Sequence, residues 1–330
     1  MHRILSFFLT LSLALTFSLT SSFAEVSWRM AHKMPPDSPE GVVFQKFSDL
    51  VDQYSNGEME IKMFPNEQLG KTNAVMEQLK IGTVHMYAEG STYMKKWVPD
   101  ITWTSPAFLF DDRDHWVRFM NTDMVKGWYD KAAQEAGVML LGDPTAILRG
   151  PYRVMVTTRD VREFADMKGL ALRMHPNKDA VATWTTIGAD VKTLAWTDVY
   201  QSIQKGIVSA VNSPIALVES MRFYEVAPHI IRHDEYYQSI GFMVHKASYD
   251  SLPDNLKAAV DKAYVDTGSF SFEVMNKSAD AAIIRMKATG VTMVDIDRAP
   301  FVSVMADWYK KKDAAGELPE GFLATVEATR

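Results

Sequence analysis

Short apolar strands alternate with amphipathic helices along most of this chain, and this alternation restricts the fold more than any other sequence feature. In the first block, about residues 25–148, the strands Val26 to Ala31 and Met59 to Met63 flank a helix with apolar residues at helical spacing. A second block, about residues 150–236, repeats the pattern, with strands near 152–157, 170–174, 190–194 and 207–211. Repeated strand–helix–strand units predict parallel sheets with helices on both faces.

A long helical segment follows the second block and has no place in either block alone. It runs from Pro253 to about Thr289, and a strand to Ile296 and a helix to Lys311 come after it. We therefore expect an α/β fold with two lobes, each a βα sheet flanked by helices, linked by this long helix. Such a clamshell closes on a ligand at the carboxyl ends of its strands. The predicted lobe I spans residues 25–148 plus about 237–278, lobe II spans 149–236 plus about 279–330, and the ligand cleft lies between them.

The N-terminus has the three parts of a secretory signal peptide. Arg3 provides the positive charge, Ile4 to Leu19 form an apolar run, and Ser22 to Ala24 match a small-x-small cleavage site. We expect cleavage after Ala24. A retained membrane anchor is the alternative, but the apolar run is short for a membrane span.

Composition narrows the class of protein further. The 330 residues include no cysteine, so an exported chain of this kind fits the bacterial periplasm, and thiolate metal sites are excluded. The formal charge is −6, and it becomes −7 once cleavage removes Arg3, the only formal charge in residues 1–24. This charge argues against a nucleic-acid partner, which would need a basic face.

Motifs of catalysis are absent from the sequence. It contains no G-x-S-x-G, H-E-x-x-H, G-x-G-x-x-G or Walker motif, and we expect no enzyme activity. His229 and His233 have metal-like spacing, but Ile230 and Ile231 indicate a strand, so we expect neither a metal site nor a cofactor. The acids in "FDDRDHW" at 110–116 are better explained as a loop that caps a helix.

Two arginines are candidates for anion binding. Arg173 stands at the end of the strand in "KGLALRMHP", where open α/β sheets bind ligands, although a solvent-facing arginine would look the same. Arg153 alternates with the apolar face of "YRVMVTT" at the junction of the two blocks. Paired guanidinium groups suit a carboxylate, because each donates two parallel hydrogen bonds and stays charged.

An ordered set of motifs resembles one protein family over nearly the whole mature chain. The sequence is similar to the solute-binding proteins of tripartite ATP-independent periplasmic (TRAP) transporters, of the DctP type. Each motif is weak alone, but their order is specific. The motifs are "FPNEQLGKTNAVMEQLKIGTVHM", "SPAFLF", "DMKGLALRM", "IGADVKTLAWTDVYQSIQKGIVSAV", "FYEV" and "LPDNLKAAV".

The resemblance implies roles for particular residues. Arg173 matches the family arginine that binds the substrate carboxylate, and Arg153 matches a second family arginine, with Arg149 as its competitor if the alignment shifts. Trp196 matches an aromatic residue that packs on the ligand, although a core tryptophan is the simpler alternative. Glu89 matches a polar cleft position in some members.

The sequence departs from the family pattern at one point. Many members have "ENP" where this chain has Asn212, Ser213 and Pro214, so Ser213 takes the usual asparagine position. We expect Ser213 to cap a helix that starts at Pro214, and Asn212 to provide the side-chain amide. His32, after the first strand, matches a further contact in relatives.

The resemblance implies a periplasmic receptor that captures a small organic anion and delivers it to the small and large TRAP membrane subunits for secondary-active uptake. A carboxylate, including an aromatic acid, or a sulfonate suits the arginines. Two alternatives remain at this point: a periplasmic sensor that presents its closed form to a receptor, and a hydrolase.

Overall fold

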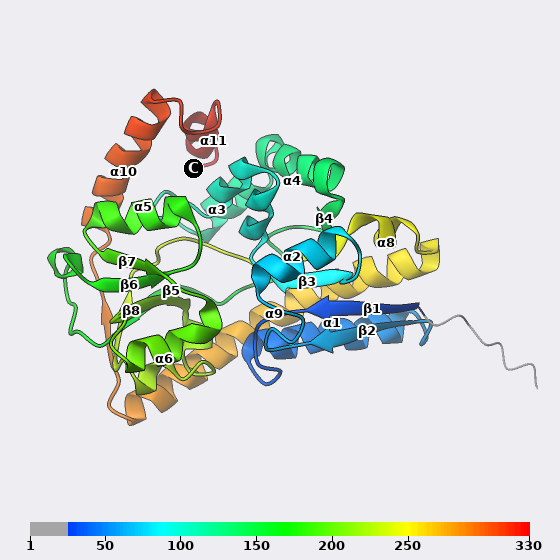
Figure 1. The fold of residues 1–330 in the computed structure, drawn as a ribbon, viewed down its shortest axis with the longest axis horizontal. Helices are drawn as coiled ribbons and strands as arrows, with labels where there is room; N and C mark the ends of the chain where they lie inside the picture. Colours follow the sequence, from blue (N-terminus) through cyan, green and yellow to red (C-terminus); the bar gives the residue numbers. More distant parts are fainter. Residues whose placement is uncertain (1–25) are drawn as a thin grey trace, which may run out of the picture.

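The computed structural model describes residues 26–330, and the expected signal peptide lies outside them. The chain folds into two α/β lobes, each built on one sheet (Figure 1). Lobe I contains a five-stranded sheet with the order β2-β1-β3-β10-β4. Its strands are β1 (Val26–Ala31), β2 (Met59–Phe64), β3 (Met86–Glu89), β4 (Val138–Leu140) and β10 (Gly241–His245).

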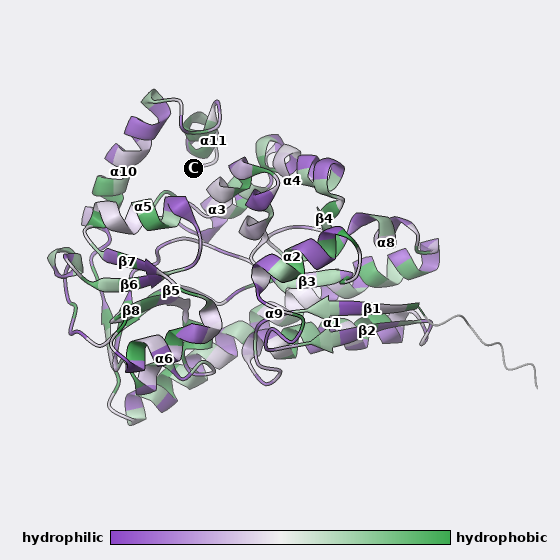
Figure 2. Ribbon diagram, in the orientation of Figure 1, coloured by the Kyte–Doolittle hydropathy of each residue, from purple (hydrophilic) through white to green (hydrophobic). Residues whose placement is uncertain are grey.

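Lobe II contains a six-stranded sheet with the order β11-β9-β5-β8-β6-β7. Its strands are β5 (Arg153–Thr157), β6 (Ala171–Met174), β7 (Asp190–Thr193), β8 (Ala210–Pro214), β9 (His229–Arg232) and β11 (Thr292–Asp295). Figure 2 shows hydrophobic residues along β5 and β8 in the middle of this sheet and hydrophilic ones along β7 at its edge. The central strands are therefore covered on both faces.

Helices pack around both sheets. In lobe I these are α1 (Pro39–Tyr54), α2 (Thr72–Lys80), η1 (Ser91–Lys96), η2 (Pro99–Thr104), α3 (Arg113–Met120), α4 (Asp123–Ala136) and α8 (Lys246–Asp250). In lobe II they are η3 (Phe164–Met167), α5 (Lys178–Ile187), η4 (Trp196–Asp198), α6 (Val199–Gln204), α7 (Ile215–Val218) and η5 (Phe223–Glu225).

One long helix, α9 (Asp254–Ala288), runs along both lobes, as the sequence predicts (Figure 1). It packs against α1 of lobe I and α7 of lobe II. The chain then adds β11 to the sheet of lobe II and ends with α10 (Ala299–Ala314) and α11 (Phe322–Ala328). The residue boundaries of the lobes stay a prediction. The predicted lobe II includes α11, yet α11 contacts α3 of lobe I. There the carbonyl oxygen of Val326 accepts a 2.9 Å hydrogen bond from His115 Nε2.

Local sequence signals set the ends of several helices. Thr122 caps α4 and Gly137, with φ of 67°, ends it. Asp112 caps α3 by accepting from the backbone N–H of His115 at 2.7 Å, so the acids of "FDDRDHW" do cap a helix. The helix α3 itself, and α11 near the C-terminus, were not predicted.

Two predictions about this architecture are wrong. The sheets are mixed rather than parallel: β10 is antiparallel to β3 and β4, and β5 is antiparallel to β8 and β9. The strands β5 and β10 each follow a crossover from the other lobe, so each enters its sheet from the opposite side. Ser213 caps no helix, because β8 continues through Pro214 in register with β5.

No helix within residues 26–330 combines the length and the apolar character that crossing a membrane requires.

Candidate functional site

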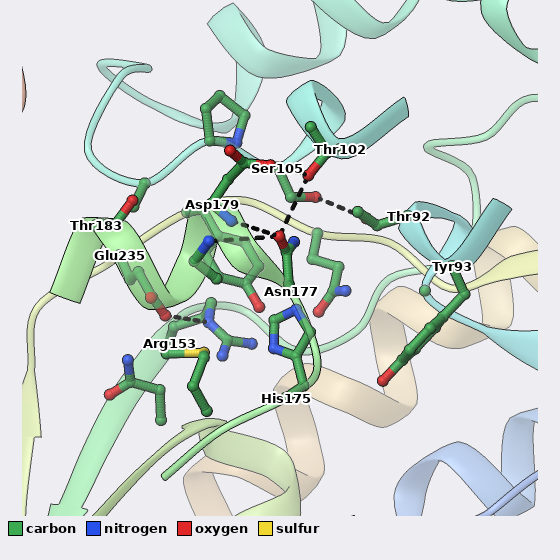
Figure 3. Close-up of a pocket in the computed structure, with 18 of the residues that line it drawn as sticks. Thr92, Tyr93, Thr102, Ser105, Arg153, His175, Asn177, Asp179, Thr183 and Glu235 are labelled. Carbon is green, nitrogen blue, oxygen red and sulfur yellow. Dashed lines mark hydrogen bonds and ion pairs between the residues drawn. The ribbon is translucent and has the colours of Figure 1, made fainter. Parts of the chain in front are cut away.

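A cavity lies between the two lobes, and elements of both line it. Its empty volume is about 1020 Å³ when the open mouth is included, which is enough for a small molecule. Lobe I contributes the ends of β1 and β3 and the helices η1 and η2. Lobe II contributes the ends of β6 and β8 and the first turns of α5, and Figure 3 shows Asn177, Asp179 and Thr183 from this helix opposite Thr92 and Tyr93.

Arg173 lines this cavity at the end of β6. It is only 6% exposed, and its Nε donates to the carbonyl oxygen of Leu194 at 2.9 Å. Within residues 26–330 its two terminal nitrogens donate no hydrogen bond, and no carboxylate forms an ion pair with it. Burial lowers the pKa of Arg173 to about 10. A buried cation without a counter-charge is costly, and a bound anion would remove that cost.

Trp196 holds the other side of the Arg173 guanidinium. The Cζ atom of Arg173 lies 5.4 Å from the centre of the indole ring, within the range of a cation–π contact. The ring also packs edge-on against Phe223 at 5.1 Å, so Trp196 belongs to the core as well as to the cavity wall. The two roles that the sequence left open are therefore compatible.

Arg153, at the start of β5, also lines the cavity, but it has a partner. Its Nε donates to Oε2 of Glu235 at 3.3 Å (Figure 3). Its Cζ lies 4.1 Å from the ring centre of Tyr236. The other carboxylate oxygen of Glu235 accepts from Nε1 of Trp184. Burial raises the pKa of Glu235, against the opposing effect of Arg153. The arginine is thus held in place and its charge is offset.

Arg149 lies in the crossover before β5 and belongs to a buried charge network of lobe I. Its Nε donates to Glu40 at 3.0 Å, and its Nη1 donates to Glu89. Lys33 Nζ lies 2.8 Å from the second carboxylate oxygen of Glu89, an ion pair without hydrogen-bond geometry. Burial, with Arg149 and Arg173 nearby, lowers the pKa of Lys33. Both candidates for the second cleft arginine therefore reach the cavity, each with carboxylate partners.

The remaining candidates divide between the cavity and the core. Asn212 lines the cavity from the middle of β8, and its Oδ1 lies 3.0 Å from Nε2 of His233. Ser213 is fully buried, does not line the cavity, and donates from Oγ to the carbonyl oxygen of Pro214 at 2.9 Å. His32 is also outside the cavity lining and packs against Phe44, 4.9 Å between ring centres.

Several cavity residues are not among those predicted from the sequence. They are Lys33, Tyr93, Lys95, His175, Asp179, Glu235, Tyr236 and Gln238. His175 directly follows β6, two residues after Arg173, and could have been found from that position. Burial lowers the pKa of His175 far below its usual range, so the ring is neutral. Nothing local marks Glu235 or Tyr236, because they reach the cavity only through the crossover that follows β9.

Contacts between the lobes close the cavity at its rim. Thr102 of η2 donates to Asp179 of α5 at 3.1 Å. Farther along the rim, Lys71 pairs with Asp198 at 3.0 Å, and Thr197 donates to Glu67 at 2.9 Å. Thr197 and Asp198 directly follow Trp196. The residue that packs on Arg173 is therefore next in sequence to residues that join the two lobes.

Metal chemistry has no support in this arrangement. In the part of the chain that the structure describes, no three His, Asp or Glu side chains gather in a way that could hold a metal ion. His229 and His233 belong to separate contacts, since His229 Nδ1 lies 2.8 Å from Oγ1 of Thr292.

Known proteins resemble this chain in sequence and fold. The family model described as bacterial extracellular solute-binding protein, family 7 (DctP), matches residues 30–314. The C4-dicarboxylate-binding periplasmic protein DctP of Rhodobacter capsulatus is 24% identical over 289 residues, which cover 85% of this chain and 83% of that protein. The 2,3-diketo-L-gulonate-binding periplasmic protein YiaO of Escherichia coli is 24% identical over 293 residues, 87% of each chain.

Solved structures agree with this similarity at the level of the fold. A TRAP periplasmic solute-binding protein from Ochrobacterium anthropi with bound L-fuconate superposes with a TM-score of 0.84 at 22% identity, covering 93% of this chain and 99% of that one. The sugar acid binding protein DctPAm from Advenella mimigardefordensis, in complex with galactonate, gives 0.83 at 20% identity, covering 93% and 100%. The chain therefore belongs to the DctP family, the bacterial extracellular solute-binding proteins of TRAP transporters, which are binding receptors rather than enzymes.

Proposed function

We propose that this protein captures a small organic acid in the periplasm, holds its carboxylate on Arg173, and delivers it to the membrane subunits of a TRAP transporter. The observation that carries the proposal is the buried guanidinium of Arg173, which lines the cavity without a carboxylate partner. Its two terminal nitrogens can donate parallel hydrogen bonds to one carboxylate. The L-fuconate and galactonate of the similar structures are acids of this kind.

The other cavity residues have supporting roles in this proposal. Trp196 fixes the guanidinium and offers its ring to the apolar part of a ligand. Arg153 adds donors from the same lobe, and Asn212 adds an amide from the middle of β8. Water leaves the cavity when the lobes close, which strengthens the contact between Arg173 and the acid.

Export to the periplasm forms part of the proposal. The family is extracellular, and residues 1–24 have the pattern of a cleaved signal peptide. The likeness to TRAP periplasmic solute-binding proteins supports the proposed delivery to TRAP membrane subunits.

Binding calorimetry on the exported protein, stripped of co-purified ligand, tests the role of Arg173. A thermal-shift screen of carboxylates and sulfonates first identifies a ligand. Arg173→Ala should then weaken its binding roughly 30-fold to several thousand-fold, because losing one partner of a desolvated charge pair costs about 2–5 kcal/mol.

Arg285→Ala is the matched control, since Arg285 is exposed and pairs with Glu219 outside the cavity. It should bind the ligand as tightly as the wild type. Unchanged affinity in a folded Arg173→Ala protein would show that the acid binds elsewhere.

A further inference from the structure

The charged side chains around the cavity differ in whether a counter-charge accompanies them. Arg173 has none, since no carboxylate among residues 26–330 lies within ion-pair distance of it. The polar partners that the described residues give its guanidinium are the carbonyl oxygen of Leu194 and the ring of Trp196, neither of which bears charge. One full positive charge is therefore available to a ligand at the end of β6.

The lobe I side of the cavity has no net positive charge. Lys33 and Arg149 supply two positive charges there, and Glu40 and Glu89 supply two negative charges within direct contact of them. Burial lowers the pKa of Lys33, so the net charge of this group is zero at most. A carboxylate placed here would meet the existing carboxylate of Glu89, and like charges in a desolvated site repel strongly.

Of the remaining cations, Arg153 is balanced in the same way, and Lys95 is not. Arg153 pairs with Glu235 at 3.3 Å. Lys95 is only partly buried and forms no ion pair within residues 26–330; its Nζ donates to the carbonyl oxygen of Pro176 at 3.3 Å. Burial lowers its pKa to about 8, and the charge of Asp179 opposes that shift. His175 is neutral because burial lowers its pKa far below the usual range. Five cations and four carboxylates thus leave a net charge of one positive charge at most.

From this balance we propose that the cavity selects monoanionic acids and rejects dianions, with Glu89 and Glu235 as the residues that exclude a second carboxylate. The inference rests on the proposed function and specifies its substrate class. A monoanion satisfies Arg173, and its uncharged hydroxyl or carbonyl groups can bond to side chains whose charges are already paired. A second carboxylate would be desolvated without a second buried cation free to pair with it, which costs far more than an uncharged polar group costs.

Pairs of acids with one skeleton but one or two carboxylates provide the test. Calorimetry with the exported protein compares D-galactonate with D-galactarate, 5-hydroxypentanoate with glutarate, and 4-(hydroxymethyl)benzoate with terephthalate. In every pair that binds, the monoanion should bind at least about tenfold more tightly, because the extra cost of the second charge exceeds about 1.4 kcal/mol.

The outcomes separate the two proposals. If a dianion binds as tightly as its monoanion and Arg173→Ala abolishes binding, the proposed selectivity is overturned. The proposed carboxylate receptor is then retained. A protein that is folded but binds no acid of the panel overturns the carboxylate receptor and the selectivity with it.

A gain-of-function variant tests the assigned residues. Glu235→Gln keeps an oxygen for Trp184 but frees the charge of Arg153, so the preference for the monoanion should fall at least about tenfold. Glu89→Gln should act in the same direction on the lobe I side. Glu219→Gln removes the same charge from an exposed pair outside the cavity and should leave the preference unchanged. Selectivity that stays as in the wild type in both cavity variants overturns the assignment.

Discussion

The guanidinium of Arg173 lies between the carbonyl oxygen of Leu194, 2.9 Å from its Nε, and the indole ring of Trp196, whose centre is 5.4 Å from its Cζ. Both partners follow β7, the strand that pairs with β6. The segment that follows the edge strand β7 therefore orients Arg173 at the end of the neighbouring strand β6. Fixing the guanidinium in this way reduces the entropy that a ligand must remove on binding.

Trp196→Ala should weaken ligand binding roughly tenfold, because the arginine loses a buried cation–π contact worth about 1–2 kcal/mol. Trp196→Phe keeps an aromatic face and should retain most of the affinity. Calorimetry with the ligand found in the thermal-shift screen measures both variants. Equal affinities of Trp196→Ala and the wild type would mean that the ring serves only the core, where it packs on Phe223.

Glu40→Gln should lower the free energy of unfolding by about 3 kcal/mol, because it leaves the buried Arg149 with one counter-charge fewer. Denaturant unfolding of the ligand-free protein provides the measurement. Glu219→Gln, in the exposed pair with Arg285, should cost less than about 1 kcal/mol. Similar losses in the two variants would argue that Arg149 does not depend on Glu40.

Lys71 and Asp198 join the lobes across the cavity rim, and their side chains are 61% and 53% exposed. An exposed pair is worth at most about 1 kcal/mol, so Lys71→Ala should speed ligand release no more than about fivefold without changing stability. Salt should reduce the difference between variant and wild type, because it screens the pair. Stopped-flow tryptophan fluorescence measures the release rate, and a variant with wild-type rates at low salt would rule out a role of this pair in holding the lobes closed.

Acid should destabilise the protein through its buried histidines. Burial lowers the pKa of His32 to about 4, whereas an unfolded histidine titrates near 6.5. Between these values the unfolded chain binds a proton that the native chain does not, so stability falls as the pH falls from about 6.5 to 4. The loss for His32 approaches about 3 kcal/mol at the lower limit.

Replacing this histidine tests the assignment. Melting temperatures of the wild type and His32→Asn between pH 7.5 and 4 should show a shallower acid decline in the variant. Some decline should remain, since burial also lowers the pKa values of His175 and His233. Identical slopes would exclude His32 as a source of the acid sensitivity.

Local signals made much of the fold predictable. Gly137 and Gly188 end α4 and α5, because both take a left-handed conformation that favours glycine. The alternation of apolar residues identified β1, β2, β6 and β9 within a residue or two. The long helix α9 and the two-lobed architecture followed from segment lengths and order.

Predictions failed where a neighbour in space decides the local structure. Ser213 is part of a strand because β5 pairs with β8 as far as Pro214, and β5 arrives from the other lobe. The antiparallel directions of β5 and β10 have the same origin. No pattern in the residues near Ser213 predicts that pairing.

By itself, the sequence determined the lobes, the order of their elements and the position of Arg173 at a strand end, because these depend on periodicity and on residues that start or stop helices. Only the tertiary structure decided which arginines have counter-charges. Glu40 and Arg149 are 109 residues apart in sequence, and Arg153 and Glu235 are 82 apart, yet each pair is in contact. Charge balance depends on distances between side chains, and only the packing of distant segments sets those distances.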